Sequence, residues 1–170
     1  LASGYQTNAS VLAALLNPRI LEADPLVYSD TLNHASIHQG CRAAGIRQIP
    51  YHHNDLDHLE SLLREDEHKK RPRFILTESV FSMDGDIIDL PRTVELCQQY
   101  DAWLMMDEAH SVGVLGVGEA SCGATGAQRA CFLSALLSSS AAAVVQPNPR
   151  FCGRPIVIAG TVSLSDSSEG

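Results

Sequence analysis

The sequence of 170 residues predicts an α/β fold built on a mostly parallel β-sheet. Between residues 1 and 116, short apolar segments alternate with segments whose apolar residues recur at helical spacing. Strands that alternate with helices pair in parallel through right-handed crossovers. Three predicted strands are followed by polar residues at their carboxyl ends, the edge where such sheets bind ligands: Ser29 with Asp30, Glu78 with Ser82, and Asp107 with His110.

The first elements follow from the spacing of leucine and valine. Residues 6–16 form the first predicted helix, because four apolar side chains fall on one of its faces. Residues 18–25 read as a surface loop, and residues 25–29 as a short apolar strand. We expect Asn33 to cap a helix that runs through residues 41–44, because asparagine favours that position.

The second half of the pattern repeats this alternation. Leu56, Leu59, Leu62 and Leu63 lie on one face of an amphipathic helix, and residues 83–86 have the composition of a turn. Proline is accepted in a first helical turn. The predicted elements are a strand over residues 47–51, a helix over 55–63, a strand over 74–78, a helix from Pro91 to about Tyr100, and a buried strand over 102–106.

Composition narrows the classes of function. The net charge of −8 and the single basic cluster, residues 68–73 directly after an acidic run, argue against a nucleic-acid surface. No apolar run is long enough for a membrane span. The five cysteines are odd in number and contain no C-x-x-C pair, which favours reduced thiols and a cytoplasmic protein. We expect no metal site at His52, His53 and His58, because no carboxylate pattern accompanies them.

Five motifs in a fixed order carry a family resemblance. They are residues 3–8 (SGYQTN), 30–37 (DTLNHASI), 53–59 (HNDLDHL), 77–86 (TESVFSMDGD) and 107–111 (DEAHS). Together they resemble the α-oxoamine synthases, enzymes dependent on pyridoxal 5′-phosphate (PLP) that include 8-amino-7-oxononanoate synthase, glycine C-acetyltransferase, 5-aminolevulinate synthase and serine palmitoyltransferase. The resemblance implies a three-layer α/β/α domain like the large domain of fold-type I PLP-dependent transferases, present here incompletely.

The resemblance also implies a set of cofactor-binding residues. PLP acts as an electron sink while its ring nitrogen is protonated, and a buried carboxylate beside that nitrogen favours the protonated form. Asp107 matches this carboxylate, His110 the partner of the phenolic oxygen, and His34 the imidazole that stacks on the ring. The remaining matches are Ser82 beside the ring, Glu78 as a supporting carboxylate, and the helix start Ser3, Gly4 and Tyr5 for the phosphate.

The catalytic lysine of the family has no match. The sequence contains two lysines, Lys69 and Lys70, and both precede the Asp107 motif. The nearest echo of the lysine motif, residues 160–164 (GTVSL), has leucine at the lysine position. No catalytic residue is therefore assigned, and an isolated chain is expected to have negligible turnover.

The resemblance stops near residue 118. We interpret residues 1–118 as a partial PLP-binding large domain and residues 119–170 as a divergent tail, with one possible strand at 155–159. The first residue is leucine, and we expect a fragment or gene remnant whose tail derives from a frameshift or an unspliced message. Sequencing the transcript across codons 110–130 tests this hypothesis, which intact in-frame messages in several clones would contradict.

The leading functional hypothesis is an acyltransferase that condenses an amino acid with an acyl-CoA to give a 2-amino ketone, as a homodimer in intact relatives. The alternative is a non-catalytic fragment that binds PLP or pairs with a full-length subunit. A third interpretation, a helicase box at residues 107–110, requires a glycine-rich phosphate loop ending in lysine, and neither lysine follows a glycine.

Overall fold

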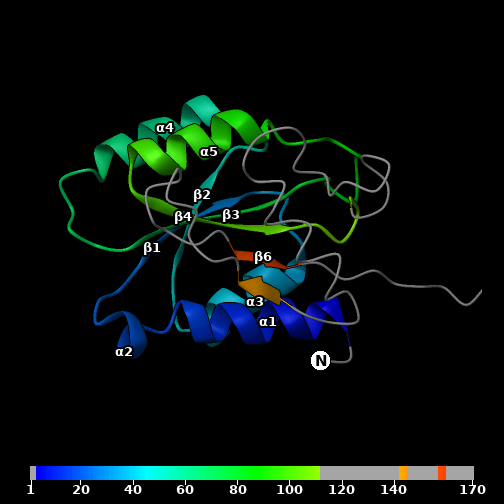
Figure 1. The fold of residues 1–170 in the computed structure, drawn as a ribbon, viewed down its shortest axis with the longest axis horizontal. Coiled ribbons are helices and arrows are strands. Elements are labelled where there is room, and N and C mark those ends of the chain that lie inside the picture. Colours follow the sequence, from blue (N-terminus) through cyan, green and yellow to red (C-terminus); the bar gives the residue numbers. More distant parts are fainter. Residues whose placement is uncertain (1–2, 112–141, 145–156, 160–170) are drawn as a thin grey trace, which may run out of the picture.

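The computed structural model describes residues 3–111, 142–144 and 157–159. In this part of the chain a six-stranded sheet lies between two helical layers, with α4 and α5 on one face and α1 and α3 on the other (Figure 1). The helices are α1 (Gly4–Leu15), α2 (Pro18–Leu21), α3 (Ala35–Ala43), α4 (Leu56–Glu65) and α5 (Leu90–Gln99). The strands are β1 (Leu26–Asp30), β2 (Gln48–Tyr51), β3 (Arg73–Glu78), β4 (Ala102–Asp107), β5 (Ala142–Val144) and β6 (Val157–Ala159).

The sheet confirms the predicted fold class. Its strand order is β2-β1-β3-β4-β6-β5, and every described pair is parallel except β5 with β6. Parallel strands with helical crossovers bring the ends of β1, β3 and β4 to one edge. Glu78 pairs with Asp107 in the register of β3 and β4, so two of the predicted site residues lie side by side.

The central strands β1, β3 and β4 are buried on both faces, and their side chains divide between two cores. Tyr28, Ile75 and Leu104 pack with the helices α4 and α5, whereas their neighbours in the strands pack with α1 and α3. The core on the α1 and α3 side contains Leu12, Leu16, Val27, Ile37, Cys41, Phe74, Leu76 and Met105.

A close approach of α1 and α3 fixes the lower layer. Gly40 in α3 lies against Leu12 in α1, where a Cβ added to the glycine would be 2.6 Å from Leu12 Cβ and 3.0 Å from the Asn8 carbonyl oxygen. Only glycine fits here without movement of a helix. This contact places Asn8 of α1 over the start of α3, where the functional site is built.

The residues that cap the helices are of the types expected from the sequence, except at the start of α3. Ser3, Asp55 and Asp89 each accept a backbone N–H at the start of α1, α4 and α5. The prediction that Asn33 caps α3 is wrong, because His34 occupies that position and its Nδ1 accepts the Ser36 N–H at 3.3 Å.

The Asn33 side chain instead forms hydrogen bonds with β1 and β3. It is buried, and its amide donates to Ser29 Oγ at 2.9 Å and to the Leu76 carbonyl at 2.8 Å. A side chain that bridges two strands is unavailable to a helix end, and the next residue takes over the cap.

The segment after α1 also differs from expectation. Residues 18–25 contain the short helix α2, capped by Asn17, whose side chain accepts the Arg19 N–H at 3.0 Å. An asparagine followed by proline is a usual helix start, with proline at the first helical position. The pair Asn17 and Pro18 therefore indicates the start of α2 in the sequence itself.

The remaining predicted elements are confirmed within one or two residues at their ends. The turn at residues 83–86 is present: Gly85 has φ +75°, and Val80 bridges Ile87 across the turn. The strand expected at 155–159 is present as β6 and pairs in parallel with β4, with Asp107 opposite Ala159. The boundary at residue 118 stays a prediction, and residues 160–164 lie outside the described part. Within the described residues, no helix has the length and apolar character to cross a membrane.

Candidate functional site

Asp107 ends β4 and is the centre of the candidate site. It is buried, and both carboxylate oxygens accept hydrogen bonds: Oδ2 from Asn8 Nδ2 at 2.6 Å and Oδ1 from the Ala109 N–H at 2.9 Å. Its backbone carbonyl accepts the Ser79 N–H at 2.9 Å, which ties the ends of β3 and β4 together. The orientation of the carboxylate is therefore fixed by neighbours from α1, β3 and its own turn.

A chain of hydrogen bonds joins Asp107 to His34. Asn8 Nδ2 also lies 3.0 Å from Ser36 Oγ, and Ser36 Oγ lies 2.8 Å from His34 Nδ1. Asn8 and Ser36 are buried, whereas His34 is exposed. The imidazole is thus held at its Nδ1 edge and presents a face to solvent, which suits stacking on a planar ring.

Glu78 connects the same histidine to β3. Its Oε1 accepts the His34 N–H at 2.5 Å, and its side chain is buried. Burial raises the pKa of Glu78 to about 7, and the nearby Asp107 and Asp30 carboxylates add to the rise, while hydrogen bonds from the His34 and Ser82 backbones oppose it. The structure therefore brings together Asp107 and Glu78 from the ends of β4 and β3 and His34 from the start of α3.

The predicted phosphate turn lies beside this group. Ser3 caps α1, with its Oγ accepting the Gln6 N–H at 3.3 Å, and Gly4 and Tyr5 form the first turn of that helix. The Tyr5 ring meets His34 edge to face at a centroid distance of 6.2 Å. The first amide groups of a helix have no partner within the helix, so this turn offers donors for an anion next to His34.

Ser82 and His110 are at the surface. Ser82 is exposed just before the turn at residues 83–86, and its backbone contacts Glu78. His110 is exposed three residues after Asp107. Both lie in the loops that follow β3 and β4, at the same edge of the sheet as Asp107, and their predicted roles stay predictions.

A second buried carboxylate at this edge, Asp30, organises a neighbouring loop. Its Oδ1 lies 3.0 Å from His53 Nδ1, and His53 Nε2 lies 3.1 Å from Asp86 Oδ2. Partial burial alone lowers the pKa of His53, but hydrogen bonds to the two carboxylates raise it overall. His53 also meets Phe81 edge to face, so it joins β1, its own loop and the 83–86 turn.

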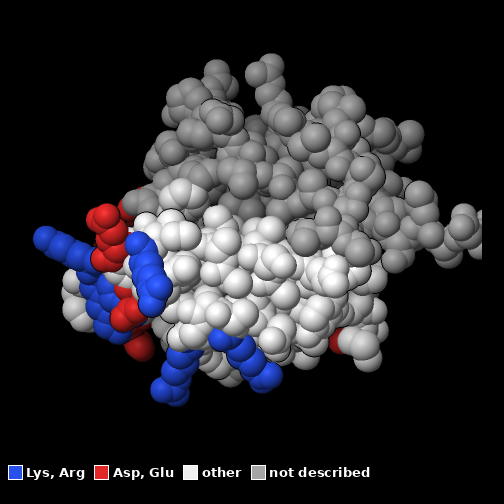
Figure 2. Space-filling model, turned by 90° about the horizontal axis from the view of Figure 1, so that it is seen from below, with Lys and Arg blue, Asp and Glu red and all other residues white. Residues whose placement is uncertain are grey.

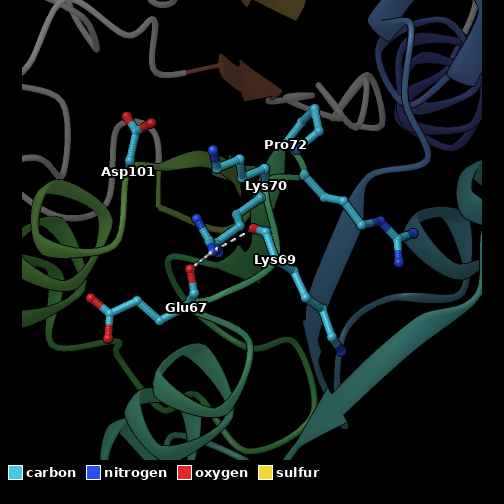
Figure 3. Close-up of a pocket in the computed structure, with 7 residues that line it drawn as sticks. Glu67, Lys69, Lys70, Pro72 and Asp101 are labelled. Atoms are coloured by element: carbon cyan, nitrogen blue, oxygen red, sulfur yellow. Dashed lines mark hydrogen bonds between the residues drawn. The ribbon is translucent and has the colours of Figure 1, made fainter.

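Both lysines lie at the opposite end of the strands, near the start of β3. Lys69 and Lys70 line a cavity of about 380 Å³ together with Glu67, Arg71, Pro72, Arg73 and Asp101 (Figure 3). Arg73 begins β3, whereas Glu78 ends it, so the cavity and the Asp107 group are separated by the length of the strand. The guanidinium of Arg73 donates to the Asp66, Glu67 and Lys69 carbonyls, which gives this cavity a structural role.

Charge is scarce over the lower helical layer. Figure 2 shows this face mostly white, with lysine and arginine side chains at its left end, where they lie beside acidic ones, and along its lower border. The sequence of α1 contains no charged residue.

The described cysteines, Cys41 and Cys97, are free thiols, and burial raises the pKa of each to about 12.

Sequence reasoning missed Asn8 and Ser36 as site residues. Both belong to motifs that carried the family resemblance, but neither has an ionisable side chain that draws attention to it. Asn8 and Asp107 are 99 positions apart in the chain, so only the folded sheet reveals their contact.

A comparison with protein families now decides the class. The family model for aminotransferase class I and II matches residues 1–162. The chain belongs to the aminotransferase class I and II family. This match covers most of the chain and extends past residue 118.

Relatives of this aminotransferase-family chain align over about two thirds of its length. A putative 8-amino-7-oxononanoate synthase from Magnetococcus marinus is 56% identical over 116 residues, which are 68% of this chain and 29% of that protein. An 8-amino-7-oxononanoate synthase from Gluconacetobacter diazotrophicus is 55% identical over 118 residues, 68% of this chain and 30% of that protein. The chain thus spans less than a third of the length of these curated relatives.

Solved structures similar to this chain are α-oxoamine synthases. Serine palmitoyltransferase from S. paucimobilis with a bound PLP–myriocin aldimine superposes with a TM-score of 0.62 at 29% identity, covering 69% of this chain and 29% of that one. The 8-amino-7-oxononanoate synthase from Francisella tularensis superposes with a TM-score of 0.56 at 29% identity, covering 69% and 31%. The predicted family and fold class are confirmed.

Proposed function

We propose that this chain forms the ring-binding part of a PLP-dependent acyltransferase related to 8-amino-7-oxononanoate synthase. The observation that supports it is the Asp107 carboxylate, buried at a strand end with both oxygens oriented by N–H donors. Relatives with that enzyme name are 55–56% identical over the segment that contains this group.

The residues present fit the ring and phosphate of PLP. Asp107 would hold the proton on the ring nitrogen, and His34 would stack on the ring from the position that Ser36 and Glu78 fix. The first turn of α1 would bind the phosphate, and His110 would reach the phenolic oxygen. Bound PLP supplies an electron sink for the carbon next to the substrate nitrogen.

The residues present do not fit covalent attachment of the cofactor. Lys69 and Lys70 are the two lysines of the sequence, and both line the cavity at the far edge of the sheet. We therefore infer that the chain of 170 residues binds the cofactor without a covalent bond and has negligible turnover by itself. An amino acid and an acyl-CoA are the proposed substrates of the intact enzyme, which would release a 2-amino ketone.

A second candidate function is pairing with another subunit. Met83 begins the 83–86 turn and Ile87 follows it, and these large apolar side chains are 86% and 58% exposed. We propose that this turn contacts a second copy, as part of a cytoplasmic homodimer. Light scattering of the purified chain and of a Met83→Ser, Ile87→Ser double variant tests this, and a monomer in the unaltered chain would exclude it.

Pyridoxamine 5′-phosphate is the sharpest probe of the ring site, because it has no aldehyde and cannot attach to a lysine. Calorimetric titration of the chain should show binding that Asp107→Asn weakens by roughly 10- to 100-fold, since a hydrogen bond to a charged group contributes about 1.5–3 kcal/mol. Asp24→Asn is the matched control, an exposed aspartate before β1 that should leave binding unchanged.

The result that would exclude ring binding at Asp107 is no titration at all, or equal affinity in Asp107→Asn. A separate experiment addresses the covalent bond: PLP is added, borohydride follows, and the intact mass is measured. An adduct on Lys69 or Lys70 that pyridoxamine 5′-phosphate blocks would contradict the non-covalent mode.

A further inference from the structure

Three side chains with metal-binding atoms meet where β2 runs into α4. His52 follows the strand, Asp55 caps the helix, and His58 lies in its first turn. One ligand atom from each residue lies within 4.8 Å of the others. The cluster is at the surface, and the His52 side chain is 75% exposed, so an ion has access from solvent.

Hydrogen bonding leaves part of this arrangement unexplained. Asp55 Oδ1 caps α4 by accepting the His58 N–H at 2.8 Å, whereas Oδ2 faces His52 Nδ1 at 3.7 Å, a distance within range of an ion pair with a protonated histidine but beyond a hydrogen bond. Two ligands held about 2.1 Å from a tetrahedral ion lie about 3.4 Å apart, close to that separation. The His52 and His58 rings also approach, with centroids 4.1 Å apart.

The backbone of this loop is fixed from the inside. His53 points into the protein, with Nδ1 3.0 Å from Asp30, and the Asn54 N–H donates to the other Asp30 oxygen at 2.9 Å. The Asp55 N–H donates to the His52 carbonyl at 3.0 Å. Because these bonds hold the residues between the three ligands, little ordering remains to be done when an ion binds.

One existing bond must be exchanged. His58 Nδ1 accepts the His52 N–H at 3.1 Å, and a metal ion at this nitrogen takes the lone pair from that bond. The bond lies at the surface, so water is available to accept the released N–H. The opposing cost is therefore one solvent-exposed hydrogen bond.

We propose that His52, Asp55 and His58 bind a divalent transition-metal ion of the zinc type. Two imidazole nitrogens and one carboxylate oxygen suit such an ion, whereas Ca²⁺ and Mg²⁺ take oxygen ligands. Three protein ligands leave a fourth position for water. The ion would join the end of β2 to the first turn of α4 on the outer side of a loop that His53 holds on the inner side.

From the sequence we expected no metal site here, because no carboxylate pattern accompanies the histidines. The structure supplies the carboxylate from Asp55, whose place before a leucine-rich segment reads only as a helix start. The spacing H-x-x-D-x-x-H brings its three members together because the helix begins between the second and the third.

Calorimetric titration with ZnCl₂ tests the proposal on the full chain, after alkylation under native conditions of any thiol that reacts, which removes competing thiolate ligands. We expect one ion per chain. Loss of a residue that only supports a metal ligand weakens metal binding by roughly 10- to 100-fold. His52→Asn and Asp55→Asn each remove a ligand itself, so each should weaken zinc binding by at least that factor. Asparagine preserves the helix cap, so Asp55→Asn removes the charge without removing the cap. The matched control is His68→Asn, an exposed histidine outside the cluster that should leave affinity unchanged.

A thermal readout separates ion binding from folding. Without zinc, both cluster variants should melt with the unaltered chain, and added ZnCl₂ should raise the melting temperature of the unaltered chain and of His68→Asn alone. Equal zinc affinity in all variants would place the ion elsewhere and overturn the proposal, as would the absence of any binding. Excess MgCl₂ that displaced the zinc would contradict the donor chemistry.

Discussion

Glu78→Gln should reveal the cost of a buried carboxylate at the end of β3. Burial raises the pKa of Glu78 from 4.5 to about 7, so the folded chain keeps this group protonated where the unfolded chain has already ionised it. The stability that the protonated group contributes is complete below pH 4.5 and is lost as the pH rises through about 7. Glutamine has no charge at any pH and does not suffer this loss.

The magnitude follows from the size of the shift. At 1.36 kcal/mol per pKa unit the full rise corresponds to about 3 kcal/mol, and relaxation of the surroundings around the ionised group reduces the expectation to about 1–3 kcal/mol. The stability of Glu78→Gln relative to the unaltered chain should therefore increase by this amount between pH 4 and pH 8. Effects of glutamine that do not depend on pH cancel in this comparison.

Urea denaturation without added cofactor measures the difference, with the single tryptophan, Trp103 in β4, as the fluorescent probe. Glu95→Gln is the matched control, because Glu95 is an exposed glutamate on α5. A difference that stays constant from pH 4 to pH 8, or that decreases, would refute the assignment of a raised pKa to Glu78.

Two further changes probe the lower helical layer and the hydrogen-bond chain. Gly40→Ala should destabilise the fold by about 1–3 kcal/mol, because its Cβ would lie 2.6 Å from Leu12 Cβ, and the exposed Gln39→Ala is the control in a urea titration. A cost below 0.5 kcal/mol would show that α1 and α3 separate with ease. Asn8→Leu keeps the branching and the number of side-chain heavy atoms but removes the donor to Asp107 and Ser36, so it should cost about 2–3 kcal/mol in the same assay and weaken binding of pyridoxamine 5′-phosphate. Unchanged ligand affinity in that variant would show that Asn8 does not position Asp107 for the cofactor.

The sheet was predictable because its strands are short apolar runs bounded by turns. β1, β3 and β4 were each located within one residue at either end, and the two-faced burial of Tyr28 with Val27 follows from the alternation of side chains along a strand. The placement of Asp107 and Glu78 at one edge follows from parallel pairing alone.

Interactions between distant segments were not predictable in the same way. Asn33 has a strong preference for helix caps, but bonds to Ser29 and Leu76 in the sheet outweigh that preference. Asn8 has no ionisable side chain that would single it out in the sequence. Its hydrogen bond to Asp107 depends on the packing of α1 against α3 at Gly40. Local propensity describes what a residue favours within its own segment, whereas these contacts arise from the assembled layers.

Under the proposed function, the geometry at the carboxyl ends of the strands separates cofactor recognition from covalent chemistry in this polypeptide. The group formed by Asp107, Glu78, His34 and their partners rests on hydrogen bonds among β3, β4, α1 and the start of α3, all within the described residues. None of these bonds involves a lysine, and the two lysines of the sequence are held at the far edge beside Arg73. A binding site of this kind remains oriented whether or not a lysine is supplied from elsewhere. Ring binding by pyridoxamine 5′-phosphate is therefore the property that should survive in this chain even where turnover does not.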